Sequence, residues 1–303
     1  TLLPVLYEHG GCDGRALGPG QKRFGNSPDK YARLQQAATK TAGRLPADTI
    51  TGVAPQSLRA VSQDGLKFAE WMATGTPIHM HLAEQAAEVE EVEAAWGKRP
   101  VDWLLSQHNV DDRWCLIHCT QMTPGETAAL AATGAVSGLC PITESSLGDG
   151  IFDGVRYLEA GGRFGVGSDS NVLISLHEEL RTLEYSQRLR DKGRAMMATP
   201  DKSTGRVLFD GACAGGAQAA GRTSGSIAAG RLADLVALDA GHPNLAGRSG
   251  DALLDSFVFA GGSGLVADVW SAGRHCVHEG NHMARGRIIQ KYLETSRLLN
   301  NTL

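Results

Sequence analysis

The chain has 303 residues, of which 42% are hydrophobic, so it is long enough for one large domain and a smaller one with a buried core. Its 29 basic and 33 acidic residues are interspersed and give a net charge of -4, which argues against a basic surface for nucleic acid. The six cysteines form no CxxC pair, no apolar run is long enough for a membrane span, and the amino terminus lacks a secretory signal, so we expect a cytoplasmic protein without membrane partners.

Six short apolar runs predict buried strands, and they alternate with longer stretches that have helical spacing. This alternation indicates repeated βα units on a parallel sheet. The six runs are LLPVLY (2–7), ITGVAP (50–55), PIHMHLA (77–83), WCLIHCT (114–120), AVSGLCP (135–141) and RFGVGSD (163–169). Because the chain begins without methionine and already in a strand pattern, we expect that an amino-terminal portion is missing.

Two segments predict outer helices. The helix predicted over 82–96 has an apolar face and a glutamate-rich face that we interpret as solvated. The apolar side chains are Val89, Val92 and Trp96, and the glutamates are Glu88, Glu90, Glu91 and Glu93. A second helix, predicted over 175–192, aligns Leu176, Leu180 and Leu183.

The pattern changes beyond about Gly225, where helical spacing gives way to short strands and turns. We therefore predict three parts: a βα domain over residues 1–225, a small β-domain over 226–283 and a helical tail over 284–303.

Polar residues stand at the carboxyl ends of the predicted strands. His81 and Glu84 end the third strand, His118 ends the fourth and Asp169 ends the sixth. Taken singly, a histidine in an apolar strand is usually a hydrogen-bonded core residue, and an aspartate before a helix is usually a cap. Four such residues at the same end of successive strands favour a common site, because those ends meet at one mouth in a parallel barrel. His79 and His81 point to the same side of their strand, and only one of them is needed as a metal ligand.

Five segments carry a family resemblance. They are HMHLAEQ (79–85), IHCTQMTPGE (117–126), GLCPITESSLGDGIF (138–152), GGRFGVGSDSN (161–171) and EELRTLEYSQRLR (178–190). Together they resemble the N-formimino-L-glutamate deiminase family of metal-dependent amidohydrolases along nearly the whole chain. The resemblance implies an α/β fold: a TIM-like (β/α)8 amidohydrolase barrel that lacks its first strands, followed by part of a small β-sandwich.

The resemblance also implies a zinc site held by His81 and Asp169, with two more histidines from an HxH motif on the first barrel strand. This sequence does not contain that motif, and His9 is not a substitute, because it follows a later strand and has no second histidine two positions away.

Two further positions bear on substrate binding. Gln56 in APQSLRAV stands where the family has a substrate-contacting histidine, whereas Arg59 is retained. Arginine offers paired donors to a substrate carboxylate. A surface pairing of Arg59 with Asp64 or another acid is an equally open interpretation.

The implied reaction is zinc-dependent hydrolysis of N-formimino-L-glutamate to N-formyl-L-glutamate and ammonia, a step of histidine degradation, in a homodimer. Asp169 would ligate zinc and accept a proton from water, His118 would support the attacking oxygen, and Glu84 would protonate the departing amine. Two alternatives stay open. One is another aminohydrolase of the superfamily, acting on guanine or a triazine ring, and the other is a non-catalytic truncated fragment.

Overall fold

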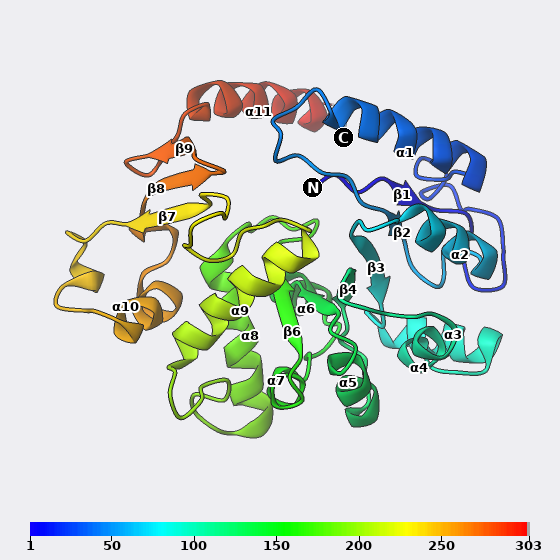
Figure 1. Ribbon diagram of the computed structural model, residues 1–303, viewed down its shortest axis with the longest axis horizontal. Helices are drawn as coiled ribbons and strands as arrows, with labels where there is room; N and C mark the ends of the chain where they lie inside the picture. The colour runs from blue at the N-terminus through cyan, green and yellow to red at the C-terminus, as the bar shows by residue number, and fades with distance from the viewer. Residues whose placement is uncertain (302–303) are drawn as a thin grey trace.

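Six short parallel strands form the framework of the chain in a computed structural model, which describes residues 1–301 (Figure 1). They are β1 (Val5–Leu6), β2 (Ala54–Pro55), β3 (Ile78–Leu82), β4 (Trp114–His118), β5 (Val136–Leu139) and β6 (Arg163–Val166). Each strand lies inside one of the six predicted runs, so the predicted positions are confirmed. Strands β1 and β2 are shorter than the apolar runs that predicted them, because Pro4 and Pro55 have no N–H to donate to a ladder.

The strands follow one another in chain order. Single bridges from Val53 to Ile78 and from Ser57 to His81 connect β2 to β3, and β3 to β6 form one continuous parallel sheet. Within residues 1–301, β1 pairs only with β2 and β6 only with β5, so the strands form an open arc. The closed eight-stranded ring is not formed by the described residues and stays a prediction for the complete natural protein.

Helices connect and flank these strands (Figure 1). They are α1 (Pro28–Ala42), α2 (Gln63–Met72), α3 (Ala86–Trp96), α4 (Pro100–Gln107), α5 (Pro124–Ala131), α6 (Pro141–Leu147), α7 (Gly154–Glu159), α8 (Leu176–Asp191) and α9 (Thr204–Ala219). Side-chain caps fix several of the starts. Ser27 caps α1, Ser62 caps α2, and Thr123 forms a capping box with Glu126 at α5.

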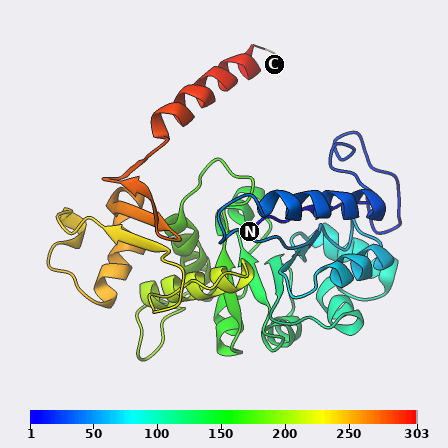
Figure 2. The same ribbon diagram turned by 45° about the horizontal axis from the view of Figure 1, so that its top comes forward.

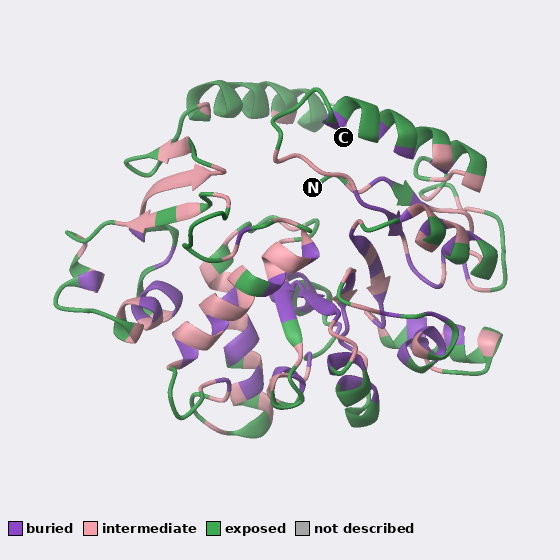
Figure 3. Cartoon of the chain, in the orientation of Figure 1, coloured by how far each residue is buried: buried purple, intermediate pink, exposed green. Residues whose placement is uncertain are grey.

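The apolar core lies where the strands meet the helices, as the buried segments of Figure 3 show. Ile78, Met80 and Leu82 of β3 are buried there, and the alternation of the strand turns His79 and His81 to its other face. The predicted apolar faces of α3 and α8 are confirmed, with one exception. Leu176 is 44% exposed, because it is the first residue of α8 and lies at the end of the helix.

Helix α9 lies directly against β6. A Cβ atom on Gly215 would stand 1.8 Å from the carbonyl oxygen of Phe164, so this approach requires glycine. The last turn of α9 also reaches β3, where the carbonyl oxygen of Ala219 is 2.7 Å from Nε2 of His79. His79 is therefore a structural histidine that ties a helix end to the strand.

The segment after Gly225 forms a second, antiparallel sheet in the order β10-β9-β8-β7. Its strands are β7 (Leu235–Leu238), β8 (Val266–Ser271), β9 (Arg274–His278) and β10 (Asn281–His282). Between β7 and β8 the chain forms η1 (Pro243–Leu245), α10 (Asp251–Ser256), the π-helical turn η2 (Phe257–Gly261) and η3 (Ser263–Leu265). The described residues supply one sheet of the expected β-sandwich, and the second layer stays a prediction.

The predicted helical tail is α11 (Arg285–Asn300), which has no buried residue and projects from the small sheet (Figure 2). Residues 302–303 of that tail lie outside the described residues. No helix among the described residues is both long and apolar enough to cross a membrane.

Candidate functional site

The backbone is unusual where the parallel strands end. Ala83 after β3, His118 and Cys119 at the end of β4, and Asp169 beyond β6 all have positive φ angles, between 50° and 73°. They are four of the eight non-glycine residues with positive φ in the described part of the chain. Such strained conformations persist where the surrounding structure enforces them, and they gather at functional sites. The positive φ angles therefore indicate a functional site at the strand ends.

His81 and His118 meet at this edge, with their ring centroids 5.5 Å apart. Nδ1 of His81 is 2.9 Å from the carbonyl oxygen of Gln56. Because a carbonyl oxygen only accepts, Nδ1 carries the proton and Nε2 keeps its lone pair. Burial lowers the pKa of His81, which favours the neutral ring. His81 is therefore held in the tautomer that a metal ligand requires.

His118 is buried between two carboxylates. Its Nδ1 lies 3.2 Å from Oε1 of Glu144, and its Nε2 lies 3.7 Å from Oε1 of Glu84. Burial acts to lower the pKa of His118, but the hydrogen bond that its ring donates to Glu144 and the charges of Glu84, Glu144 and Asp169 outweigh burial and raise the pKa. Nε2 has no hydrogen-bond partner among the described residues although it is buried. Nε2 of His118 is thus available to a bound water or substrate atom.

We call His81, Glu84, His118 and Glu144 the strand-end cluster.

Glu84 sits at the rim of this cluster, with 14% of its side chain exposed. Burial raises its pKa, against the opposing charges of His118 and Arg59. A carboxyl group with a raised pKa keeps its proton closer to neutral pH, as a general acid requires.

Glu88 corrects the sequence interpretation. It was expected on the solvated face of the helix, but it is fully buried. Its carboxylate accepts the backbone N–H groups of Ala83 and Glu84 at 3.0 and 2.9 Å. These N–H groups follow the end of β3, and the first turn of α3 brings Glu88 back over them. Glu90 and Glu93 are exposed as expected, whereas Glu91 pairs with Arg15 at 2.7 Å.

Arg59 lies between the cluster and two small cavities. Its Nη2 is 4.0 Å from Glu84 and 3.9 Å from Glu88, and the described residues contain no ion pair between Arg59 and Asp64. Cavities of about 240 and 90 Å³ both have Arg59 and His9 in their walls, and Gln56 lines the smaller one. The two predicted substrate-binding residues therefore border the same space. His9 belongs to that space rather than to the cluster.

Asp169 is exposed in the loop beyond β6. Its charge contributes to the raised pKa of His118 and acts on the pKa of His81, so it lies within electrostatic range of both rings. Among the described residues, however, it joins no group of three donor atoms that lie within 4.8 Å of one another. With Nε2 of His81 it offers two ligands, whereas catalytic zinc commonly has three from the protein. His81 and Asp169 therefore stay the predicted metal ligands.

Two buried glutamates were missed from the sequence. Glu144, in the first turn of α6, accepts the N–H of Cys140 at 3.0 Å and faces His118. Glu179 of α8 accepts the N–H of Ile142 at 2.9 Å, and burial raises its pKa to about 7. Glu144 lies in the segment 138–152 and Glu179 in the segment 178–190, and both segments carry the family resemblance. That resemblance was the available signal.

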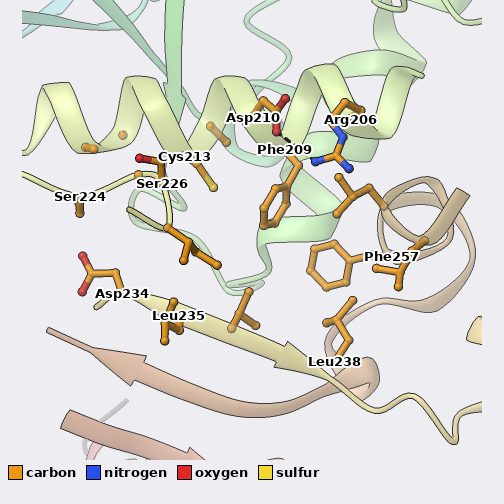
Figure 4. A pocket seen from close by; sticks show the side chains of 18 residues that line it. Arg206, Phe209, Asp210, Cys213, Ser224, Ser226, Asp234, Leu235, Leu238 and Phe257 are labelled. Carbon is orange, nitrogen blue, oxygen red and sulfur yellow. Dashed lines mark ion pairs between the residues drawn. The ribbon is translucent and has the colours of Figure 1, made fainter. Parts of the chain in front are cut away.

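A larger cavity, of about 780 Å³, lies elsewhere (Figure 4). Its walls come from α9, β7 and η2, with Phe209, Leu235, Leu238 and Phe257 among them. None of the strand-end cluster lines it. Its wall is mainly apolar, with Arg206, Asp210 and Asp234 among the lining residues. The cluster does not line the two smaller cavities either, but Arg59 lines both and lies 4.0 Å from Glu84, so these are the candidates for a reacting molecule.

The sequence was compared with models of known protein families. A family model described as the amidohydrolase family matches residues 22–276. The chain belongs to the amidohydrolase family. Amidohydrolases are hydrolases and are typically metal-dependent.

Individual amidohydrolases match nearly the whole chain. A relative named formimidoylglutamate deiminase, from Pseudomonas aeruginosa, is 46% identical over 301 residues, which is 97% of this chain and 65% of the relative. The crystal structure of an amidohydrolase from Brucella melitensis matches with a TM-score of 0.92 at 46% identity, and covers 97% of this chain and 65% of that chain. A zinc-bound adenosine deaminase from Xanthomonas campestris has a TM-score of 0.82 at 22% identity, with coverages of 99% and 66%, which is a likeness of fold.

These matches confirm the predicted resemblance and the α/β amidohydrolase fold. The chain spans 65% of the length of the curated relative, so statements about the activity of the whole protein are proposals.

Proposed function

We propose that the complete natural protein hydrolyses N-formimino-L-glutamate to N-formyl-L-glutamate and ammonia, as a zinc-dependent deiminase with one ion per site. The observation that carries the proposal is the position of Arg59, whose guanidinium stands 4.0 Å from the carboxylate of Glu84. A cation for a substrate carboxylate thus lies beside a candidate proton donor. The name of the relative from Pseudomonas aeruginosa, at 46% identity, supports the choice of substrate.

The reaction adds water to the formimino carbon and breaks its bond to the terminal nitrogen, which leaves as ammonia. His81 and Asp169, together with further ligands, would hold a zinc ion, which would supply water activation at neutral pH. Asp169 would accept a proton from the attacking water. The carboxylate neighbours of His118 raise its pKa, which favours the charged ring, and an Nε2–H of that ring would stabilise negative charge on the attacking oxygen.

Glu84 completes the step by delivering a proton to the departing nitrogen. Burial raises its pKa, so the protonated form is populated nearer to neutral pH. Glu144 holds the Nδ1 side of His118 and thereby aims Nε2 at the reacting atoms. Glu88 fixes the backbone of Glu84. Both are positioning residues.

The substrate class follows from the cavities beside the cluster. Arg59 and Gln56 border them, and an arginine fork suits the carboxylates of a glutamate derivative. An aminohydrolase acting on guanine or a triazine ring would need an aromatic surface for stacking. Trp96 lines the larger of the two cavities, but its ring already packs on Trp103 at 4.4 Å between centroids, which favours the acidic substrate.

The proposal extends to a homodimer that works in the cytoplasm in histidine degradation, supported by the family resemblance.

An ammonia-release assay tests the proposal. The complete natural protein, loaded with Zn²⁺, is given N-formimino-L-glutamate, guanine and a triazine in parallel. We expect ammonia only from the first. Release from a ring substrate instead would replace the proposal with an aminohydrolase that acts on guanine or a triazine. The 303-residue chain is assayed beside the complete protein, and no release together with no bound zinc in this chain would favour the non-catalytic fragment.

A further inference from the structure

A second set of metal-ligating side chains lies on the small antiparallel sheet. Asp268 of β8 and His275 and His278 of β9 bring their ligand atoms within 4.8 Å of one another, and no other group of three does so among the described residues. Nε2 of His275 is 2.7 Å from Oδ1 of Asp268, and Nδ1 of His278 is 2.9 Å from the same oxygen. We call these three residues the hairpin cluster.

A β-bulge creates this convergence. Residues three apart on a regular strand face opposite sides of a sheet, so His275 and His278 would normally diverge. Trp270 pairs with His275, but the preceding Val269 pairs with Val277, so Cys276 is the extra residue. The bulge reverses the alternation and returns His278 to the side of His275. The extra residue, Cys276, therefore places His275 and His278 on the same face of the sheet.

The turn and a ring contact hold the geometry. Ala272 and Gly273, which join the two strands, both have positive φ, at 47° and 78°, as a tight two-residue hairpin requires. The ring of His275 stacks on Trp270, with 4.7 Å between centroids and 13° between planes. The two imidazoles stand edge to face at 5.2 Å. Their nitrogens therefore approach one carboxylate oxygen from two directions.

Two imidazoles and one carboxylate form a mixed nitrogen and oxygen donor set that suits Zn²⁺ and Cu²⁺. The ring of His278 is 64% exposed and that of His275 38% exposed. An ion can therefore reach the cluster from solvent and complete its coordination with water. Hydrogen bonding of two histidines to an aspartate is the simpler alternative, and it would leave the cluster without metal affinity.

We propose that Asp268, His275 and His278 bind a divalent transition-metal ion that clamps the β8–β9 hairpin, at a site separate from the strand-end cluster. The ion takes the place of the two protons that now lie between the imidazoles and the carboxylate. In a neutral ring that proton moves to the other ring nitrogen, and in a charged ring it passes to solvent. The site does not depend on the proposed deiminase reaction.

The stacked indole provides the test. Protein without an affinity tag is stripped with a chelator and titrated with Cu²⁺ while tryptophan fluorescence is followed. We expect quenching that saturates at about one equivalent, because copper at the cluster stands next to the ring that stacks on Trp270. Trp270→Phe should remove that phase. Zn²⁺ should compete with it.

Matched variants distinguish Cu²⁺ binding at the hairpin cluster from nonspecific Cu²⁺ binding at other surface histidines. His278→Gln and Asp268→Asn should each weaken Cu²⁺ binding at least about tenfold, since each removes one of three ligands. His282→Gln, an exposed histidine on neighbouring β10, and His81→Gln at the strand ends should leave the Trp270 signal unchanged. Equal affinity in His278→Gln and His282→Gln, with folding intact by circular dichroism, would overturn the proposal.

Discussion

The chain contains two groups of imidazoles and carboxylates in opposite environments. In the strand-end cluster, only 1% of the His118 side chain is exposed, and the surrounding strands are buried on both faces (Figure 3). In the hairpin cluster, 64% of His278 is exposed, on a sheet whose strands are half-buried. The same kinds of side chain, imidazoles and carboxylates, are therefore buried in one cluster and exposed to water in the other.

Burial accounts for the difference. At the strand ends it favours neutral forms, so it lowers the pKa of His81 and raises that of Glu84. Proton transfer needs groups of this kind, whose charge states are set by their surroundings. At the hairpin both rings are partly exposed to water, and the hydrogen bond that His278 donates to Asp268 raises the pKa of His278. An exposed group of donors suits the exchange of an ion with solvent rather than proton transfer.

The largest expected effect lies in the buried cluster, at Glu84. Glu84→Gln keeps the shape of the side chain but removes the proton donor, so we expect ammonia release to fall roughly 10²- to 10⁴-fold. Zinc content should not change, because Glu84 is not a ligand in the proposed mechanism. Steady-state kinetics and metal analysis of the complete natural protein check both points.

Glu90→Gln is the matched control, because Glu90 is an exposed carboxylate on the same helix. It should keep normal activity. Normal activity in Glu84→Gln as well would remove Glu84 from the mechanism.

A second expected effect concerns stability rather than catalysis. Glu88→Ala leaves the buried N–H groups of Ala83 and Glu84 without their acceptor, so we expect a loss of about 1–3 kcal/mol in the free energy of unfolding. Urea denaturation measures this. Glu90→Ala should change it by less than about 0.5 kcal/mol, as is usual for exposed positions. If the two variants unfold alike, the inward role of Glu88 is wrong.

Much of the framework could be predicted from the sequence. All six parallel strands lie in apolar runs, and the period of two assigned His81 to one face of β3. The strand ends then brought His81 and His118 to 5.5 Å, because parallel strands in chain order end at one edge. Which of these residues bind metal stays a prediction.

The residues that sequence reasoning missed depend on contacts between distant segments. The sequence does not distinguish Glu88 from the other glutamates of its helix. Its role depends on the backbone N–H groups of Ala83 and Glu84, which only the folded structure brings to its carboxylate. Glu144 becomes part of the cluster only because β5 lies next to β4. The hairpin cluster depends on a one-residue bulge, and register of this kind is set by cross-strand pairing rather than by local pattern.

The smallest expected effect is at the hairpin without metal. Asp268 interacts with two exposed rings, and exposed ion pairs contribute little to stability because water and salt screen them. With a chelator present, Asp268→Asn should therefore leave the melting temperature unchanged within about 1 °C, as circular dichroism can measure. With Zn²⁺ present, the unchanged protein should melt at a higher temperature than the variant, because the ion binds only the folded hairpin. A large drop in the melting temperature of Asp268→Asn with chelator present would mean that the hydrogen bonds of Asp268 themselves hold β8 to β9. The contrast between the two clusters would then fail, because the exposed cluster would stabilise the fold without an ion.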